Sequence, residues 1–435
     1  MDCTNYRGIS LLNVTYKVLA KILSRRLEVF AEHIIGDYQC GFRRGRSTTD
    51  HIFAIRGILE KCYEYNIPVH QLFIDFRQAY DSVKRSYLQE TLNNFRIPGK
   101  LARLIMMTLK HTKSKVKVSG GRSREFTIRK GLKQGDALSC TLFNLVLERT
   151  MRQLTNNPGG TLLNRLTQHM AYADDVDLLG RREQELREMF IEFEEESKRA
   201  GLSINEAKTK YMYMSRKAKH HLTGSFAINS YEFEKVDTFK YLGSLITSNN
   251  ENPLEIKDRI KAGNKAYYSL QKLLKSRFLT RTSKKRIYRT ILRPVVLYGG
   301  ETWVMTKKEE EGLNTWERKV LRRIYGPVCD LGEWRIRTNE EIYELYGENT
   351  IVAEVKSARL RWLGHIERMP EERGVKKVYR QKPEGRRLPG RPRKRWLDCV
   401  EEDLKELGVR GWRRKGLDRE EWRRVVQEAK VLNGL

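Results

Sequence analysis

Short apolar runs alternate with amphipathic segments along the chain to about residue 245, and this pattern predicts a mixture of strands and helices. The run Val69–Phe76 is apolar enough for a buried strand. Lys113–Val118 and Glu125–Arg129 flank Gly120-Gly121, a pair that favours a turn, so these two segments predict a hairpin. The first part of the chain is therefore expected to be α+β.

Helical spacing of apolar residues marks several longer segments. Leu138–Leu154 and Glu183–Ala200 both show it, and Gly201 stands where the second of these helices is expected to end. From Pro253 to about Gly326 the chain is expected to be mainly helical and basic. Within it, Lys257–Leu274 places apolar residues on one helix face and Lys and Arg on the other.

The last stretch, to Leu435, combines aromatic and basic residues. All seven tryptophans lie beyond residue 300. Most are expected in the core, because a basic helical domain needs large apolar side chains to pack. One or two can stack on bases. The segment Lys376–Trp396 contains ten basic residues, one acid, three prolines and two glycines, which predicts an extended linker.

Charge narrows the class of partner. Lys and Arg number 85 against 55 Asp and Glu, a formal net charge of +30. Such an excess repels itself unless a polyanion screens it, so nucleic acid is the first partner expected and an anionic membrane surface a weaker alternative. No apolar run approaches the ~18–20 residues of a membrane span. The six cysteines show no zinc-ligand spacing.

Three acids suggest the chemistry. Asp174 and Asp175 follow Tyr172-Ala173 in a pattern of strand, tight turn and strand. Adjacent carboxylates oppose each other's ionisation, and a divalent cation with a preference for hard oxygen ligands removes that cost. Taken alone the pair is weak evidence, because Asp is common in turns. Asp75, at the end of the apolar strand, either caps the following turn or supplies a third ligand.

Seven motifs in order resemble the reverse transcriptase of non-long-terminal-repeat (non-LTR, LINE-type) retrotransposons, and the resemblance covers essentially the whole chain. They are Asn5–Leu12 (NYRGISLL), Gln39–Asp50 (QCGFRRGRSTTD), Phe73–Val83 (FIDFRQAYDSV), Gly131–Phe143 (GLKQGDALSCTLF), Tyr172–Asp175 (YADD), Gly201–Lys208 (GLSINEAK) and Phe239–Leu245 (FKYLGSL).

The resemblance implies a right-hand polymerase fold. Its expected parts are partial fingers over residues 1–68, a palm with inserted fingers elements and a primer-grip hairpin over 69–245, a helical thumb over 246–326, and a basic nucleic-acid-binding region over 327–435. It also implies two Mg²⁺ ions, for which Mn²⁺ is a possible substitute, held by Asp75, Asp174 and Asp175. The expected partners are an RNA template, a DNA primer or target DNA, and dNTPs.

Nucleotide-binding roles follow from the same resemblance. Tyr80 matches the aromatic residue that selects dNTP over rNTP by its clash with a 2′-hydroxyl. Gln134 and Gly135 match the loop that supports the templating base and the nucleotide; a plain turn is the alternative. Arg7 and Lys17 match triphosphate-binding residues of the fingers, with solvated surface as the alternative.

Further roles concern the proton and the nucleic acid. Lys208 matches a proposed general acid for pyrophosphate, and a solvated lysine is the alternative. Arg43 and Arg46 are expected to contact the template backbone or to support the fingers. Tyr241 and Gly243 lie in the segment that resembles the primer grip.

The chain departs from the family pattern in places. Gly8 and Cys140 stand where the family often has proline, and neither departure affects the chemistry. The family has more fingers sequence before Arg7 and usually an endonuclease upstream. The chain is therefore expected to be an N-terminally truncated part of a longer element protein, with processive activity in doubt.

Residues 389–394 (PGRPRK) resemble an AT-hook. Arg391, Arg393 and Lys394 would enter a narrow minor groove, where the potential is strongly negative. A basic linker or a nuclear-import signal can have the same sequence pattern.

The sequence thus predicts an RNA-directed DNA polymerase acting in the nucleus and cytoplasm. A catalytically idle nucleic-acid-binding remnant is the alternative. An RNA-templated RNA polymerase is disfavoured by Tyr80, because that class commonly has an acid there.

Overall fold

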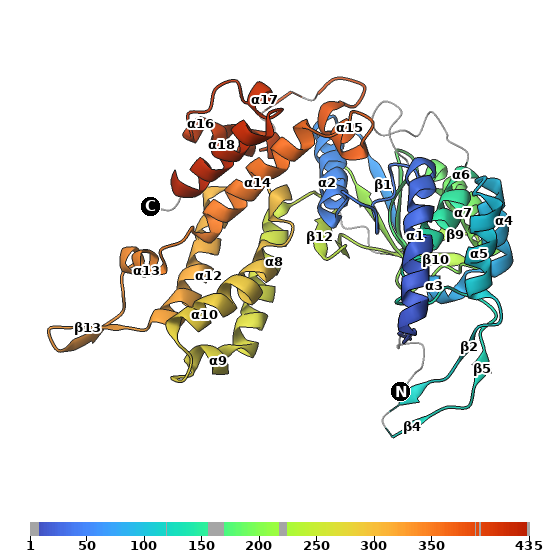
Figure 1. The fold of residues 1–435 in the computed structure, drawn as a ribbon. Coiled ribbons are helices and arrows are strands. Elements are labelled where there is room, and N and C mark those ends of the chain that lie inside the picture. The colour runs from blue at the N-terminus through green and yellow to red at the C-terminus, as the bar shows by residue number, and fades with distance from the viewer. Residues whose placement is uncertain are drawn as a thin grey trace. The chain divides into compact units, whose positions relative to one another are not determined.

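The computed structural model describes residues 8–118, 120–154, 169–216, 224–387, 389–390 and 393–432 (Figure 1). They form two compact units. The first comprises the chain up to His51 with Tyr65–Asp237 and Gln381–Arg386, and the second comprises Ile52–Glu64, Thr238–Arg380 and the chain from Arg387. The division at residue 237 lies near the expected end of the palm, whereas 52–64 join the second unit. The names fingers, palm and thumb stay predictions.

The first unit has the expected α+β composition. In its described part, one sheet has six strands in the order β6-β7-β1-β8-β10-β9. The strands are β1 (Val69–Ile74), β6 (His169–Tyr172), β7 (Asp175–Gly180), β8 (Lys210–Met214), β9 (Ser225–Ile228) and β10 (Tyr231–Lys235). The helices are α1 (Val14–Ile34), α3 (Ala79–Ser82), α4 (Arg85–Asn94), α5 (Gly99–Leu109), α6 (Ser139–Arg152) and α7 (Glu183–Ala200), and α2 (Thr48–Glu64) runs from this unit into the second.

The elements expected from hydrophobic periodicity are confirmed here. Helix α7 has the predicted bounds and ends at Gly201, whose φ of 88° is left-handed. The predicted hairpin consists of four short strands, β2 (Lys113–Ser114) with β5 (Phe126–Thr127) and β3 (Lys117–Val118) with β4 (Gly121–Arg122). Local signals were sufficient because these elements are set by turn residues and spacing.

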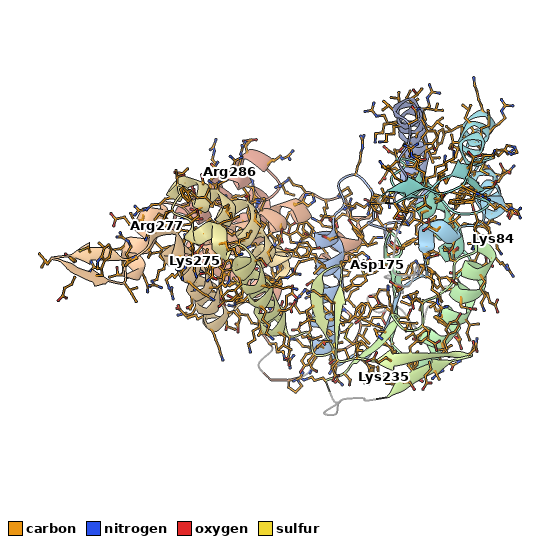
Figure 2. All side chains as sticks on the ribbon, turned by 90° about the horizontal axis from the view of Figure 1, so that it is seen from below. Lys84, Asp175, Lys235, Lys275, Arg277 and Arg286 are labelled. Atoms are coloured by element: carbon orange, nitrogen blue, oxygen red, sulfur yellow. The ribbon has the colours of Figure 1, made fainter. Side chains whose placement is uncertain are left out.

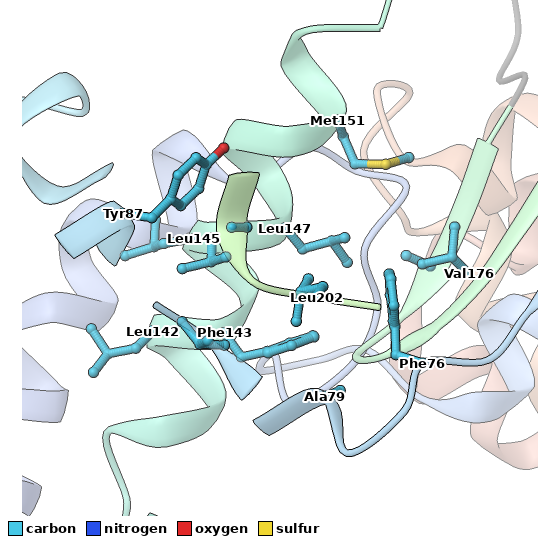
Figure 3. Close-up of a cluster of buried hydrophobic side chains, with 14 of the residues drawn as sticks. Phe76, Ala79, Tyr87, Leu142, Phe143, Leu145, Leu147, Met151, Val176 and Leu202 are labelled. Carbon is cyan, nitrogen blue, oxygen red and sulfur yellow. The ribbon is translucent and has the colours of Figure 1, made fainter. Parts of the chain in front are cut away.

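One face of the central strands forms the core. In the antiparallel pairing of β1 with β7, Leu72 stands opposite Leu178 and Ile74 opposite Val176. All four side chains are at most 2% exposed and belong to one apolar cluster with residues of the helices. Figure 3 shows the neighbouring part of this cluster, with Phe76, Phe143, Leu147, Met151, Val176 and Leu202. Each large side chain buried here contributes about 1.5–3 kcal/mol.

The second unit is mainly helical. Its helices are α8 (Asn252–Ser269), α9 (Gln271–Lys275), α10 (Arg281–Ile287), the π-helix η3 (Tyr288–Leu292), α11 (Arg293–Leu297), the 3₁₀ turn η4 (Gly300–Thr302), α12 (Lys307–Tyr325), α13 (Asn339–Tyr346), α14 (Ile351–Glu367), α15 (Gly374–Arg380), α16 (Trp396–Glu406), α17 (Trp412–Lys415) and α18 (Arg419–Leu432). Two hairpins accompany them, β11 (Thr238–Tyr241) with β12 (Ser244–Thr247) and β13 (Val328–Asp330) with β14 (Glu333–Arg335). No helix in the described ranges has the length and apolarity needed to cross a bilayer.

Most tryptophans are in the core, as predicted. The buried ones are Trp303, Trp316, Trp362, Trp396 and Trp422. Trp334 is 72% exposed, whereas Trp412 is partly buried. Lys275 on α9, Arg277 in the following loop and Arg286 on α10 are labelled in Figure 2.

The prediction of an extended linker over Lys376–Trp396 is wrong at its start. Residues 376–380 belong to α15, and the Lys376 side chain is fully buried. Its ammonium group donates to the carbonyls of Ile366 (2.9 Å) and Glu367 (2.8 Å) and pairs with the Glu367 carboxylate at 3.2 Å. A cation at the C-terminus of α14 satisfies carbonyls that have no helical partner. Composition alone predicts a solvated Lys376, because it does not show that Ile366 and Glu367 pack against this side chain.

We expect Gly201→Ala to destabilise the first unit more than Gly120→Ala does. Both glycines have a left-handed φ (88° and 96°), which costs alanine about 1–2 kcal/mol. A Cβ at Gly201 would also lie 2.7 Å from the Ser82 carbonyl oxygen, whereas one at Gly120 meets open space. The excess should be about 1 kcal/mol or more in denaturant unfolding. Equal losses would contradict the packing described for Gly201.

Candidate active site

The turn between β6 and β7 is held by a buried glutamine. Tyr172 pairs with Asp175, and Ala173 between them has a φ of 57°, which is unfavourable for alanine. The Gln39 side chain, 1% exposed, accepts from the Ala173 N–H (2.8 Å) and donates to its carbonyl (3.2 Å). These two hydrogen bonds offset the strain and fix the position of Asp174.

Gly41 permits this contact. A Cβ at Gly41 would lie 2.2 Å from the Ala173 nitrogen, so a larger residue would displace the turn. Sequence reasoning found the segment Gln39–Asp50 but assigned its function to Arg43 and Arg46. It missed Gln39 and Gly41, because nothing local indicates that they pack on a turn more than 130 residues away.

Strand register brings the separate acids to one end of the sheet. Ile74 is the last residue of β1 and stands opposite Val176 on β7. Asp75 directly follows the end of β1, and Asp175 is the first residue of β7, so both lie at the same end of this strand pair. Asp174 precedes Asp175 at the tip of the turn. Asp75, Asp174 and Asp175 are all partly exposed; Asp175 is labelled in Figure 2.

A second turn orients Asp75. The Asn205 side-chain amide donates to the Asp75 carboxylate at 3.0 Å, and the Asn205 N–H donates to the Asp75 carbonyl at 2.7 Å. The Asp75 N–H in turn donates to the Thr209 hydroxyl at 3.2 Å. Lys208 is exposed in this same turn. The structure therefore brings Lys208 to the strand end that carries Asp75.

The acids suit a divalent ion by ligand type. Carboxylate oxygens are the hard ligands that Mg²⁺ prefers. The fold places three residues with such side chains at one end of the sheet. Over the described ranges, however, no three Asp, Glu, His or Cys side chains gather closely enough to form a ready metal site. The backbone placement therefore fits a metal, while the side chains of Asp75, Asp174 and Asp175 do not already converge.

Tyr80 lies beside this group of acids. Its ring stacks on Phe143 at a centroid distance of 4.7 Å and an angle of 25°. The pKa of its hydroxyl is raised above the usual range, first by burial and then by nearby Cys140 and Asp174. Tyr80 thus stands within electrostatic reach of Asp174, a contact that sequence spacing alone does not give.

The Gln134 loop packs on α3, the short helix that contains Tyr80. The Gln134 amide donates to the Asp81 carboxylate at 3.1 Å, and its carbonyl accepts from the Ser10 N–H at 2.9 Å. Gly135 has a φ of 99°, which favours glycine. Lys17 is exposed on α1. Arg7 lies outside the described residues.

Arg43 and Arg46 have structural contacts. Their side chains are only 4% and 6% exposed. Arg43 pairs with Glu32 at 2.8 Å, and Arg46 pairs with Asp37 at 2.5 Å. The expected roles were template contact or support of the fingers. These contacts support the local fold, because they leave little guanidinium surface for a template phosphate.

The hairpin expected as the primer grip belongs to the second unit. Tyr241 is 3% exposed, so its ring is in the core and not on a binding surface. Two hydrogen bonds hold the turn at Gly243. The Arg259 guanidinium donates to the Gly243 carbonyl, and the Tyr298 hydroxyl donates to the Leu242 carbonyl at 2.7 Å. The Tyr241 ring is therefore not available for primer contact.

The described part of the AT-hook-like segment packs within the second unit. Arg393 donates to the Asn249 carbonyl at 2.8 Å and lies over the Tyr63 ring at 4.1 Å. Lys394 pairs with Glu402 at 2.6 Å. Arg391 lies outside the described residues. DNA binding by this segment stays a prediction.

Sequence reasoning also missed Asp177. It lies two residues after Asp175 on β7, which puts both side chains on the same face, and it is fully buried. The Gln71 amide donates to it at 3.2 Å. Burial raises its pKa well above the usual 3.8, although the hydrogen bond from Gln71 acts in the opposite direction. The alternation of Asp175 and Asp177 along a strand was the available signal.

Comparisons with known proteins agree on one family. The family model described as reverse transcriptase (RNA-dependent DNA polymerase) matches residues 1–246. The chain is 30% identical over 179 residues to the retrovirus-related Pol polyprotein from type-1 retrotransposable element R2 of Popillia japonica, covering 40% of this chain and 25% of that protein. It is 25% identical over 377 residues to the probable RNA-directed DNA polymerase from transposon X-element of Drosophila melanogaster, covering 84% of this chain and 40% of that protein.

The chain therefore spans 25% and 40% of the length of these two relatives over the matched regions. Among solved structures, apo telomerase from Candida tropicalis matches 84% of this chain and 62% of that one, at 10% identity and a TM-score of 0.42. That likeness is too low to carry an argument.

We expect Asp177→Asn to stabilise the protein, and increasingly so as the pH rises. The unfolded carboxyl loses its proton near pH 3.8, whereas the folded one keeps it to a much higher pH. Above pH 3.8 the folded state thus binds more protons than the unfolded state, so stability falls as the pH rises toward the folded pKa. Asparagine removes this loss.

The measurement is urea unfolding of both proteins at pH 5 and pH 8, with Glu195→Gln as the matched control on an exposed position of α7. The control should differ from the parent equally at both pH values. A pH-independent effect of Asp177→Asn would show that Asp177 is already ionised in the folded state.

Proposed function

Because the chain belongs to the reverse transcriptase (RNA-dependent DNA polymerase) family, we propose that it is the RNA-directed DNA polymerase of a non-LTR retrotransposon. The family resemblance inferred from the seven motifs is confirmed by the family model and by the retrotransposon relatives. One observation carries the proposal: the pairing of β1 with β7 leaves Asp75 at the end of the sheet where Asp174 and Asp175 form the turn into β7.

In this proposal the three acids hold Mg²⁺. When bound, two such ions activate the primer 3′-hydroxyl and stabilise the leaving pyrophosphate. Gln39 fixes the turn that carries Asp174, and Asn205 holds the carboxylate of Asp75 in place. These two amides act as positioning residues, since neither needs to contact the substrate.

Nucleotide selection is assigned to the aromatic ring beside the acids. Tyr80 is braced by Phe143 and lies near Asp174, which supports its role as the group that meets the sugar 2′ position. Lys208, exposed in the turn that binds Asp75, is proposed to give a proton to the pyrophosphate. Lys17 and Arg7 are proposed to hold the triphosphate.

The proposed partners are an RNA template, a DNA primer or target DNA, and dNTPs, with action in the nucleus and cytoplasm. The net charge of +30 supports a polyanionic partner.

A catalytically idle nucleic-acid-binding remnant is the second candidate. The observation in its favour is that the carboxylate side chains do not gather around one point in the described structure. The unbroken set Asp75, Asp174 and Asp175 favours the enzyme. Primer extension decides between them.

We expect Asp174→Asn to abolish primer extension on an RNA template with Mg²⁺ and dNTPs. Neutralising one ligand removes several kcal/mol of charge stabilisation, so the rate should fall about a hundredfold or more. Glu195→Gln, the same change of acid to amide at an exposed position of α7, should leave the rate unchanged. Extension that survives in Asp174→Asn would refute the assignment, and a parent chain that binds nucleic acid without extending it would favour the idle remnant.

We expect Tyr80→Val to incorporate rNTP more readily, because the ring that meets the 2′-hydroxyl is gone. The ratio of kcat/KM for rNTP to that for dNTP should rise by about tenfold or more. Tyr80→Phe keeps the ring and its stacking on Phe143, so it should keep the ratio of the parent. If both variants changed the ratio equally, the hydroxyl and not the ring would be the selective group.

A further inference from the structure

A basic cavity lies within the second unit, between α14 and α18. Its volume is about 740 Å³, within the usual range for sites that hold a ligand of nucleotide size. None of the residues proposed above for catalysis or nucleotide binding lines it. Its polar and aromatic lining includes Arg361, Trp362, His365, Arg368, Arg419 and Arg423.

Helix packing presents these groups together. Arg361 and His365 are four residues apart on α14, and Arg419 and Arg423 are four apart on α18, so each pair shares a helix face. The two helices approach closely at Gly364, where a Cβ would lie 2.2 Å from ring atoms of Trp422. The Trp422 indole also donates to the Leu360 carbonyl at 2.9 Å. The cavity is thus built on rigid elements.

Positive charge in the cavity exceeds negative charge. Its lining has four arginines against two acids, Glu301 and Glu420. Arg423 is 3.8 Å from Glu420, whereas Arg361 and Arg419 make no ion pair within the part of the chain that the structure describes. The pKa of Arg368 is lowered by burial and then by the like charge of Arg419. An anion in the cavity would relieve this repulsion.

One lining group also needs an acceptor. Trp362 is 8% exposed, and its Nε1–H is buried with no hydrogen-bond partner among the described residues. Leaving such a donor unpaired costs free energy, so unpaired donors often mark a site completed by a ligand or by water. The guanidinium groups of the lining only donate, and phosphate oxygens only accept. The lining therefore matches an acceptor-rich anion.

We propose that this cavity binds the sugar-phosphate backbone of single-stranded nucleic acid. The proposal rests on the proposed function, which supplies a single-stranded template as substrate. A cavity of this size takes one nucleotide of a flexible strand, whereas a duplex presents its phosphates on a convex surface. Arg361, Arg419 and Arg423 contact the phosphate.

The test measures binding of the full chain to fluorescent single-stranded RNA, single-stranded DNA and duplex DNA by anisotropy over a range of salt. The cavity variant is Arg361→Gln with Arg423→Gln. The matched control is Arg410→Gln with Arg424→Gln, which removes the same charge from exposed positions outside the cavity, one of them on α18.

Single-strand affinity should fall about tenfold or more in the cavity variant and about twofold or less in the control. The slope of log affinity against log salt should shrink by about 0.7 in the cavity variant, which corresponds to one phosphate on a single strand. RNA and DNA arms show which strand the cavity prefers.

Equal losses in the cavity variant and the control would overturn the proposal, because the cations would then act only through net charge. A cavity that bound poly-glutamate better than either single strand would overturn it in favour of an acidic protein segment.

Measuring binding in the Asp174→Asn background separates this proposal from the polymerase. Loss of extension with retained, cavity-dependent binding leaves the cavity assignment intact. A polymerase that is active while every variant binds alike removes the cavity assignment alone.

Discussion

The antiparallel register of β1 against β7 is the constraint on which the candidate site depends. Leu72 and Ile74 lie beside Leu178 and Val176 on the core face of the sheet, and the opposite face of β7 carries Asp175 and Asp177. A slip of β1 by one residue would turn Leu72 and Ile74 to the other face of the sheet. Burial of these apolar side chains therefore determines which acids lie at the same end of the sheet, although the apolar side chains take no part in the chemistry.

Side-chain amides fix the positions of the acids at this end of the sheet. Gln39 spans the strained turn at Ala173, and Asn205 binds the carboxylate of Asp75. An amide can donate to a carboxylate without adding charge, so it orients the group while leaving its negative charge for a cation. Buried Asp177 is a different case, because burial raises its pKa and favours its neutral form.

Many cations of this very basic chain have structural partners. Lys376 is buried against carbonyls of α14, Arg359 pairs with Asp403 at 2.5 Å, and Arg259 pairs with Glu255 at 2.9 Å. Net charge therefore overstates the number of groups that can meet a phosphate. The cations that combine exposure with a shared cavity, such as Arg361 and Arg423, are better candidates than charge density along the sequence would suggest.

The sequence by itself determined the elements whose signals are local. The helix that ends at Gly201, the hairpin around Gly120 and the order of motifs around Asp75, Asp174 and Asp175 could all be read from spacing and turn residues. Only the tertiary structure decided what surrounds each polar group. It gave Arg43, Lys376 and Tyr241 buried positions and showed that Gln39 supports the turn at Ala173. The physical reason is that burial and ion pairing depend on residues distant in sequence, whereas turn geometry and helix ends depend on neighbours.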